Sequence, residues 1–213
     1  MKKLLFLLLV LASLPLVSEV LLKEMKKTPT IDGVLSEDEW PWRIEQPFSV
    51  VAKGTVPEIP PRLFMGYDDG YIYVALKLNK NALTQNAAHK KEIFSRSRAE
   101  FRFGTKERIS MFALAFDGEK FPSQGWEGLC KEGVIEAAFP LEMLPDTRVF
   151  SGNIVVCIGD ENSSLFPIGR LSFDAPEYHG KFSLGTAAEI EAWQTARAQK
   201  LSQEAAINES MLT

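Results

Sequence analysis

Residues 62–78 constrain the fold most, because they have the pattern of two β-strands joined by a tight turn. Apolar side chains occupy every second position from Ile72 to Leu78, as expected for a strand with one buried face. The intervening Asp68-Asp69-Gly70 favours a chain reversal, since aspartate bonds its own backbone and glycine accepts positive φ. An isolated hairpin is only marginally stable, so we expect other strands to cover its apolar face.

Further stretches have the apolar pattern of strands: residues 48–52, 99–103, 109–116, 134–139, 154–158 and 181–184. Residues 187–206 contain neither glycine nor proline and carry an apolar stripe, which predicts an amphipathic helix. Short strands followed by one helix predict an all-β fold. We expect an antiparallel, jelly-roll-like β-sandwich with a C-terminal α-helix rather than an α/β fold.

The first 18 residues resemble a secretory signal peptide. Lys2 and Lys3 precede an unbroken apolar run over residues 4–12, which is too short to cross a bilayer comfortably. We therefore expect a signal peptide at residues 1–18, the sandwich at 19–185 and a helical tail at 186–213. The expected location is secreted or periplasmic, and a retained interfacial anchor is the alternative.

Charge and cysteine content limit the partners and the compartment. Removal of residues 1–18 takes two of the 24 basic side chains, leaving 22 against 28 acidic ones, so we expect no nucleic-acid partner. Cys130 and Cys157 are the only cysteines, each in or beside a strand-like stretch. In an oxidising compartment they would form one bridge between neighbouring strands, and two buried free thiols are the alternative.

The sequence lacks the motifs of common enzymes and cofactor sites. His89 and His179 have no partner at the spacing of a metal site or a catalytic triad, and we expect both at the surface or in turns. No metal or other cofactor is predicted, and we do not expect an enzyme. The two carboxylates that cleave a glycosidic bond are brought together by the fold and have no fixed spacing in the sequence. A glycoside hydrolase therefore stays open as an alternative. Trp40 is better explained as a core anchor than as a ligand platform.

Five short motifs stand in one order along the chain: Ile31-Asp32-Gly33 with Glu39-Trp40, residues 67–75, Ala99-Glu100-Phe101, residues 134–141 and residues 172–180. In this order and at this spacing they resemble family 9 carbohydrate-binding modules, over about residues 30–184. The resemblance implies a secreted β-sandwich that binds sugars. It also implies an accessory role in polysaccharide breakdown by attached or neighbouring hydrolases.

The same resemblance implies a ligand site. Two aromatic rings that clamp a terminal sugar correspond to Phe94 and Phe173, and a carboxylate that holds sugar hydroxyls corresponds to Glu100. Stacking on a ring and hydrogen bonding to a carboxylate suit a neutral glycan. Arg98 stands where the family motif has serine, and the family's arginine on the next strand corresponds to Phe112.

The segment around Glu100 is basic within an acidic chain; its cations are Lys90, Lys91, Arg96, Arg98, Arg102, Lys106 and Arg108. These residues would guard an exposed edge strand or would make the sugar site prefer acidic glycans. The leading hypothesis is a secreted, non-catalytic carbohydrate-binding domain. One alternative is a structural or protein-interaction sandwich without sugar binding, which docks a partner protein through the C-terminal helix around Trp193. A small secreted glycan-active hydrolase is the other.

Overall fold

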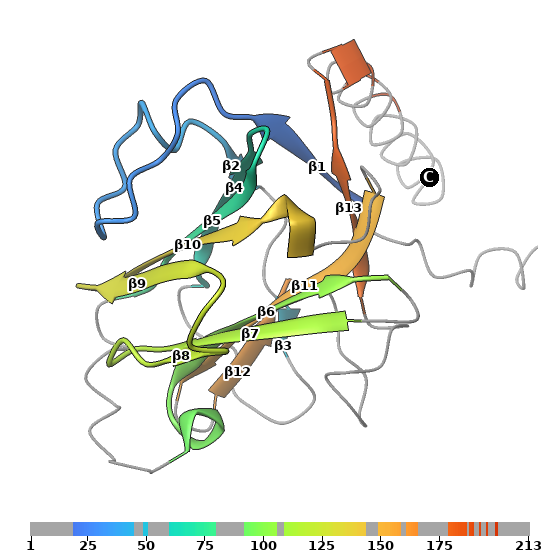
Figure 1. Cartoon of the computed structure of the whole chain (residues 1–213). Coiled ribbons are helices and arrows are strands. Elements are labelled where there is room, and N and C mark those ends of the chain that lie inside the picture. The colour runs from blue at the N-terminus through green and yellow to red at the C-terminus, as the bar shows by residue number, and fades with distance from the viewer. Residues whose placement is uncertain are drawn as a thin grey trace, which may run out of the picture.

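The computed structural model describes residues 19–44, 49–50, 60–79, 92–105, 109–143, 149–158, 161–165 and 179–186, and five residues between 188 and 199. Within them the chain forms thirteen β-strands and two short 3₁₀ segments, η2 (Ile93–Ser95) and η3 (Leu141–Met143). The all-β prediction is confirmed for the described residues. Figure 1 shows the strands arranged as two facing layers.

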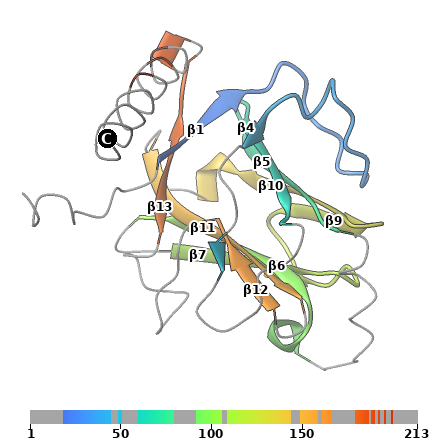
Figure 2. The ribbon, with the colours of Figure 1, turned by 180° about the vertical axis from the view of Figure 1, so that it is seen from behind.

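The first layer contains β8 (Lys120–Phe121), β7 (Ile109–Ala115), β6 (Arg98–Gly104), β11 (Val149–Ile158) and β13 (Gly180–Leu184), in this order, with β12 (Glu161–Ser164) and β3 (Ser49–Val50) beyond β11. The second contains β4 (Arg62–Tyr67), β5 (Tyr71–Lys77), β10 (Val134–Pro140) and β9 (Glu127–Lys131), and β2 (Arg43–Ile44) pairs with β4. Figure 2 shows the same layers from behind.

Strand β1 (Glu19–Glu24) joins the two layers, and it corrects the prediction of a purely antiparallel sandwich. Its first four residues pair with β13 and its last two with β4, in parallel both times. The result is one mixed, thirteen-stranded sheet, and the end strand β9 contacts β7, which is next to the other end. Sequence patterning missed β1 because its apolar residues directly follow the apolar run of the expected signal peptide.

The predicted hairpin is present as β4 and β5, and its strands pair with Leu63 opposite Leu76 and Met65 opposite Val74. Ile72 to Leu76 is buried throughout, which shows that both faces of β5 are covered. Between the layers lies an aromatic core to which both contribute: Phe101, Phe103, Phe112, Trp126, Phe139, Phe150 and Phe182. Trp126 stacks on Phe139 at a centroid separation of 5.1 Å. These contacts hold the two layers together.

Asp68 shapes the turn of this hairpin, as predicted. Its Oδ1 accepts hydrogen bonds from the backbone N–H groups of Gly70 and Tyr71, both at 2.9 Å, and its Oδ2 accepts one from the Tyr73 hydroxyl at 2.7 Å. Burial acts to raise the pKa of Asp68, but these hydrogen bonds together outweigh it and hold the pKa below its ordinary value. The ionised carboxylate therefore stabilises the turn.

A second apolar cluster, around Trp40, covers the outer face of the second layer. Beside it Glu136 of β10 is fully buried and accepts three hydrogen bonds: from the N–H groups of Asp32 and Gly33 at 2.9 and 2.5 Å, and from Trp40 Nε1 at 2.9 Å. Burial raises the pKa of Glu136 despite these bonds. Gly33 has φ of 81°, and a Cβ there would lie 2.7 Å from the Cβ of Lys131. Trp40 is thus a buried anchor, as predicted.

Cys130 and Cys157 are free thiols, so of the two alternatives that the sequence left open, a bridge or two free thiols, the structure has the free thiols. Cys130 lies on β9, at one end of the sheet, and packs against the core. Cys157 lies on β11, opposite Arg98 in the register with β6. Burial raises the pKa of the two thiols to about 11 and about 12, respectively.

Most of the predicted helical tail, Trp193 included, lies outside the described residues. Ala188, Glu189, Ala192, Thr195 and Gln199 have helical backbone. Thr186 and Glu189 bond each other reciprocally, because Thr186 N donates to Glu189 Oε2 at 2.7 Å and Glu189 N donates to Thr186 Oγ1 at 3.4 Å. This is a capping box, which starts a helix. The full tail helix stays a prediction. None of the helical stretches that are described has the length and hydropathy needed to traverse a bilayer.

Candidate functional site

The candidate site lies on the outer face of the first layer, where β6 presents three charged side chains. Alternation along β6 sends Phe101 and Phe103 into the core, while Arg98, Glu100 and Arg102 point to the other face. Glu100 is only 1 % exposed. Since β6 pairs with both β7 and β11, it is not an edge strand, and the expectation that its arginines guard an exposed edge is wrong.

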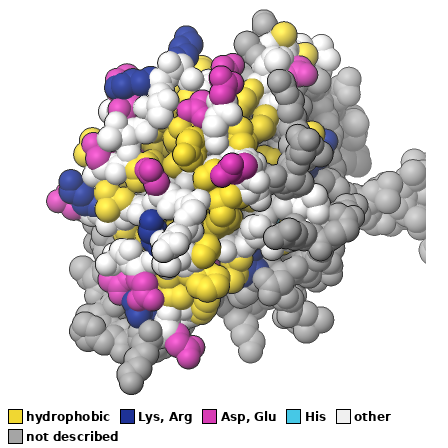
Figure 3. Space-filling view, viewed as in Figure 1, with side chains coloured by type: hydrophobic (Ala, Val, Ile, Leu, Met, Phe, Trp, Pro, Cys, Tyr) yellow, Lys and Arg dark blue, Asp and Glu magenta, His cyan; other side chains and the backbone are white. Residues whose placement is uncertain are grey.

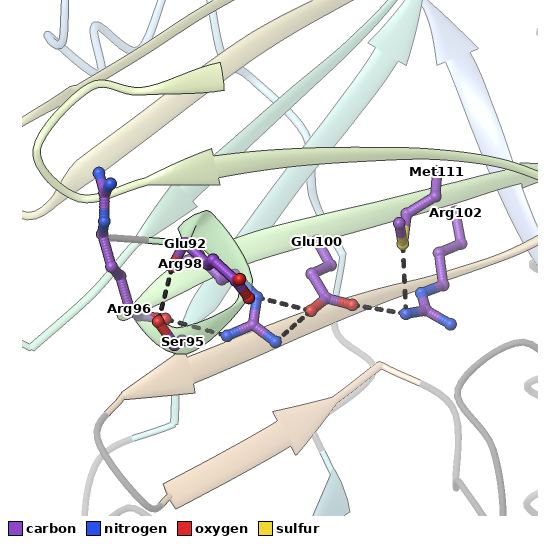
Figure 4. A network of polar contacts seen from close by, with 7 residues as sticks. All are labelled: Glu92, Ser95, Arg96, Arg98, Glu100, Arg102 and Met111. Atoms are coloured by element: carbon purple, nitrogen blue, oxygen red, sulfur yellow. Dashed lines mark hydrogen bonds and ion pairs between the residues drawn. The ribbon is translucent and has the colours of Figure 1, made fainter. Parts of the chain in front are cut away.

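Both oxygens of the Glu100 carboxylate are engaged by arginines (Figure 4). Arg98 Nε donates to Oε1 at 2.7 Å, and Arg102 Nη2 donates to Oε2 at 2.6 Å. Arg102 also reaches Met111 Sδ, at 3.5 Å, on the neighbouring strand. A buried carboxylate between two guanidinium groups is held in one position, so the geometry makes Glu100 an organiser of the two arginines.

Phe94 lies beside this charged row. It belongs to η2 and is 39 % exposed, and the guanidinium carbon of Arg98 lies 5.6 Å from its ring centroid. Arg98 also donates to the backbone carbonyl of Arg96 at 2.9 Å, which ties β6 to the segment that follows η2. The structure thus brings together Phe94, Arg98 and Glu100. Phe173 lies outside the described residues, and its part in the site stays a prediction.

The three arginines of the basic run that the structure describes, Arg96, Arg98 and Arg102, form ion pairs. Arg96 points away from Glu100 (Figure 4) and pairs with Asp117 and Glu119, while Arg98 and Arg102 share Glu100. Lys90, Lys91, Lys106 and Arg108 lie outside the described residues. On the face of the molecule seen in Figure 3, acidic and hydrophobic side chains mix over the described surface, without a broad basic patch.

Two positions differ from the sequence-based expectation. Phe112, taken as the counterpart of the family's arginine, is 1 % exposed in the core, and Ala113 is the residue opposite Glu100. His179 is buried directly before β13 and is not a surface residue. The alternation of β7 contained the signal for Phe112, because neighbouring positions on a strand face opposite sides. Among the described residues, no cluster of three or more possible metal ligands occurs.

Sequence reasoning also missed Phe121, which is 44 % exposed on β8. Its ring contacts that of Phe94 at a centroid separation of 5.3 Å with an interplanar angle of 70°. β8 contributes only two residues to the sheet, too few to show an alternating pattern. Two partly exposed aromatic rings therefore meet next to Arg98.

Comparison with known proteins gives one consistent result. No family model matches the sequence, and no curated protein matches it. Among solved structures, two of a family 9 carbohydrate-binding module from Caldicellulosiruptor kristjanssonii match, one in complex with cellotriose and one with glucose. Both matches have a TM-score of 0.58 and cover 79 % of this chain. The cellotriose complex is 12 % identical in sequence and is covered over 94 % of its own chain, and the glucose complex is 13 % identical and is covered over 96 %. The chain has the fold of family 9 carbohydrate-binding modules.

Proposed function

We propose that this protein is a non-catalytic carbohydrate-binding domain whose ligand stacks on Phe94. The observation that carries the proposal is the partly exposed Phe94 ring, beside Arg98 and Glu100, in a fold shared with sugar-bound modules. An exposed aromatic face suits the C–H face of a pyranose, and guanidinium N–H groups suit its hydroxyl oxygens. Phe173 is proposed as the second ring of the clamp.

The first ligands to test are neutral gluco-oligosaccharides. The two structural neighbours hold cellotriose and glucose, and Glu100 neutralises part of the charge of Arg98 and Arg102. Acidic glycans are the alternative, and their binding would weaken as salt is added. Catalysis is not proposed, because Glu100, the site's carboxylate, is buried between two arginines and so is poorly placed to act on a sugar.

We also propose that residues 1–18 are a signal peptide and that the mature chain acts outside the cytoplasm, as an accessory to polysaccharide breakdown. The basic start and apolar run support the first point. The tail beyond Thr186, which opens with a capping box, is proposed as a helix that contacts a partner protein. Mass spectrometry of the exported chain would locate its N-terminus.

The test is isothermal titration of the purified chain with glucose, cellotriose and an oligogalacturonide, each at low and high salt. We expect binding of the neutral sugars that does not depend on salt. Phe94→Ala should weaken it about fivefold or more, since a stacked ring is worth on the order of 1 kcal/mol or more. Val149→Ala, at a similarly exposed apolar position on β11, is the matched control and should bind normally. A wild-type chain that binds none of the sugars would refute the proposal.

A further inference from the structure

Phe121 lies on the same face of the sheet as Glu100. The register places Glu100 of β6 opposite Ala113 of β7, and Ala113 opposite Phe121 of β8. Side chains directly opposite one another on paired strands share a face, so one row runs from the charged centre of the site to Phe121. The 3₁₀ segment η2 lies over this face as well, because Ile93 packs on Ala113 and Ala115.

The segments that carry Phe94 and Phe121 are tied together without the help of either ring. Arg96, which follows η2, forms ion pairs with Asp117 and Glu119 in the turn between β7 and β8. On the opposite face of β8, Lys120 donates to the Trp126 carbonyl at 3.1 Å. These contacts fix the turn and the short strand. The short strand that carries Phe121 is therefore held beside η2 by contacts other than the ring pair.

Exposure of both rings is unexpected if their contact serves only to stabilise the fold. The five large hydrophobic side chains found exposed among the described residues are Val34, Tyr71, Phe94, Phe121 and Val149. Among these five, Phe94 and Phe121 form a ring pair. An edge-to-face pair of exposed rings forms an apolar corner, and exposed apolar surface beside polar groups is typical of a binding site.

We propose that Phe121 is a further aromatic contact of the sugar site, beyond the Phe94 and Phe173 clamp, and takes the sugar unit next to the one stacked on Phe94. The two ring centroids lie 5.3 Å apart with an interplanar angle of 70°, so a chain that stacks on the Phe94 ring passes the Phe121 ring with its neighbouring unit. The site therefore prefers a linear chain of two or more units over a monosaccharide. This inference rests on the proposed function, because it extends the site at Phe94.

The experiment compares glucose with cellotriose on the wild-type chain and on Phe121→Ala, by isothermal titration. The wild-type chain should bind cellotriose more tightly than glucose. Phe121→Ala should lose about threefold to tenfold in cellotriose affinity, as expected for one aromatic contact, with glucose affinity unchanged. Phe121→Tyr, which keeps the ring, should retain most of the preference. Thermal melting of each variant confirms that it folds.

The outcomes separate the two proposals. Equal weakening of glucose and cellotriose binding in Phe121→Ala would make Phe121 only a support for Phe94 and would overturn the inference. Unchanged cellotriose binding would overturn it as well, while the proposed function would stand. A wild-type chain that binds neither sugar would remove the proposed function and this inference with it.

Discussion

Substitution of Glu136 by glutamine tests whether the second apolar cluster depends on one buried carboxylate. Glu136 accepts two backbone hydrogen bonds on one oxygen and the Trp40 indole hydrogen bond on the other. Glutamine offers only one oxygen, so its NH₂ group must face an N–H donor whichever way the amide turns. At least one buried donor is then left without an acceptor.

The magnitude follows from this geometry. A hydrogen bond to a charged group is worth about 1.5–3 kcal/mol, and an orphaned buried donor adds about 1–3 kcal/mol. Burial of the carboxylate raises the pKa of Glu136, so the neutral amide avoids part of the penalty for burying charge. We expect Glu136→Gln to lower the free energy of unfolding by about 2–4 kcal/mol.

Urea unfolding followed by tryptophan fluorescence measures this loss. Glu142→Gln, at an exposed position of η3, is the matched control and should change stability by less than about 0.5 kcal/mol. Trp40→Phe removes the indole donor and should cost about 1–3 kcal/mol. The double variant with Glu136→Gln should lose less than the sum, by about 0.5 kcal/mol or more. Near-wild-type stability of Glu136→Gln, or full additivity, would refute the reasoning.

Three further predictions concern exposure and ionisation. Phe94→Ala should lower the free energy of unfolding by about 1 kcal/mol or less, whereas Phe112→Ala, in the core, should lower it by about 3–5 kcal/mol. If calorimetry finds the same loss of stability in both variants, the partly exposed placement of Phe94 is contradicted. Because the folded pKa of Asp68 lies below its ordinary value of 3.8, the stability it contributes is present above about pH 4 and is lost as pH falls through the folded pKa. Asp68→Asn should flatten this acid slope, measured by urea unfolding at pH 3 and pH 6; an unchanged slope would count against it. Cys130 and Cys157 should resist iodoacetamide at pH 8 in the folded chain, since burial raises their pKa to about 11 and about 12, and both should react in urea without reductant. A thiol that stays unlabelled in urea would indicate a disulfide.

Sequence patterning predicted the elements whose local signals agree with their tertiary surroundings. The hairpin of β4 and β5 has alternation, a turn and an apolar face that all point to the same structure. Strands β6, β7 and β10 follow their predicted ranges closely, because each has a continuous side facing the aromatic core. Because local sequence signals determine where these strands begin and end, they could be predicted from a single sequence.

The features that patterning missed leave no local signal in the sequence. The parallel pairing of β1 requires β13 and β4, which lie about 160 and 45 residues further along. The burial of Glu100 depends on two arginines of its own strand, and a charged side chain gives no sequence signal for burial. The exposure of Phe121 likewise follows from its position on a two-residue strand.

The motifs that carry the family resemblance divide into two groups with different physical roles. Asp32-Gly33, Trp40 and Glu136 form one hydrogen-bonded unit on the second layer, whereas the candidate site is on the first, and Asp68 holds a turn. These residues preserve the fold whatever the ligand is. Phe94 and Arg98 lie at the candidate site, where the sequence departs from the family pattern. A fold can therefore be retained while its ligand changes. For this reason the function is decided by titrations of the Phe94 and Phe121 variants. Further similarity in the motifs that stabilise the fold does not decide it.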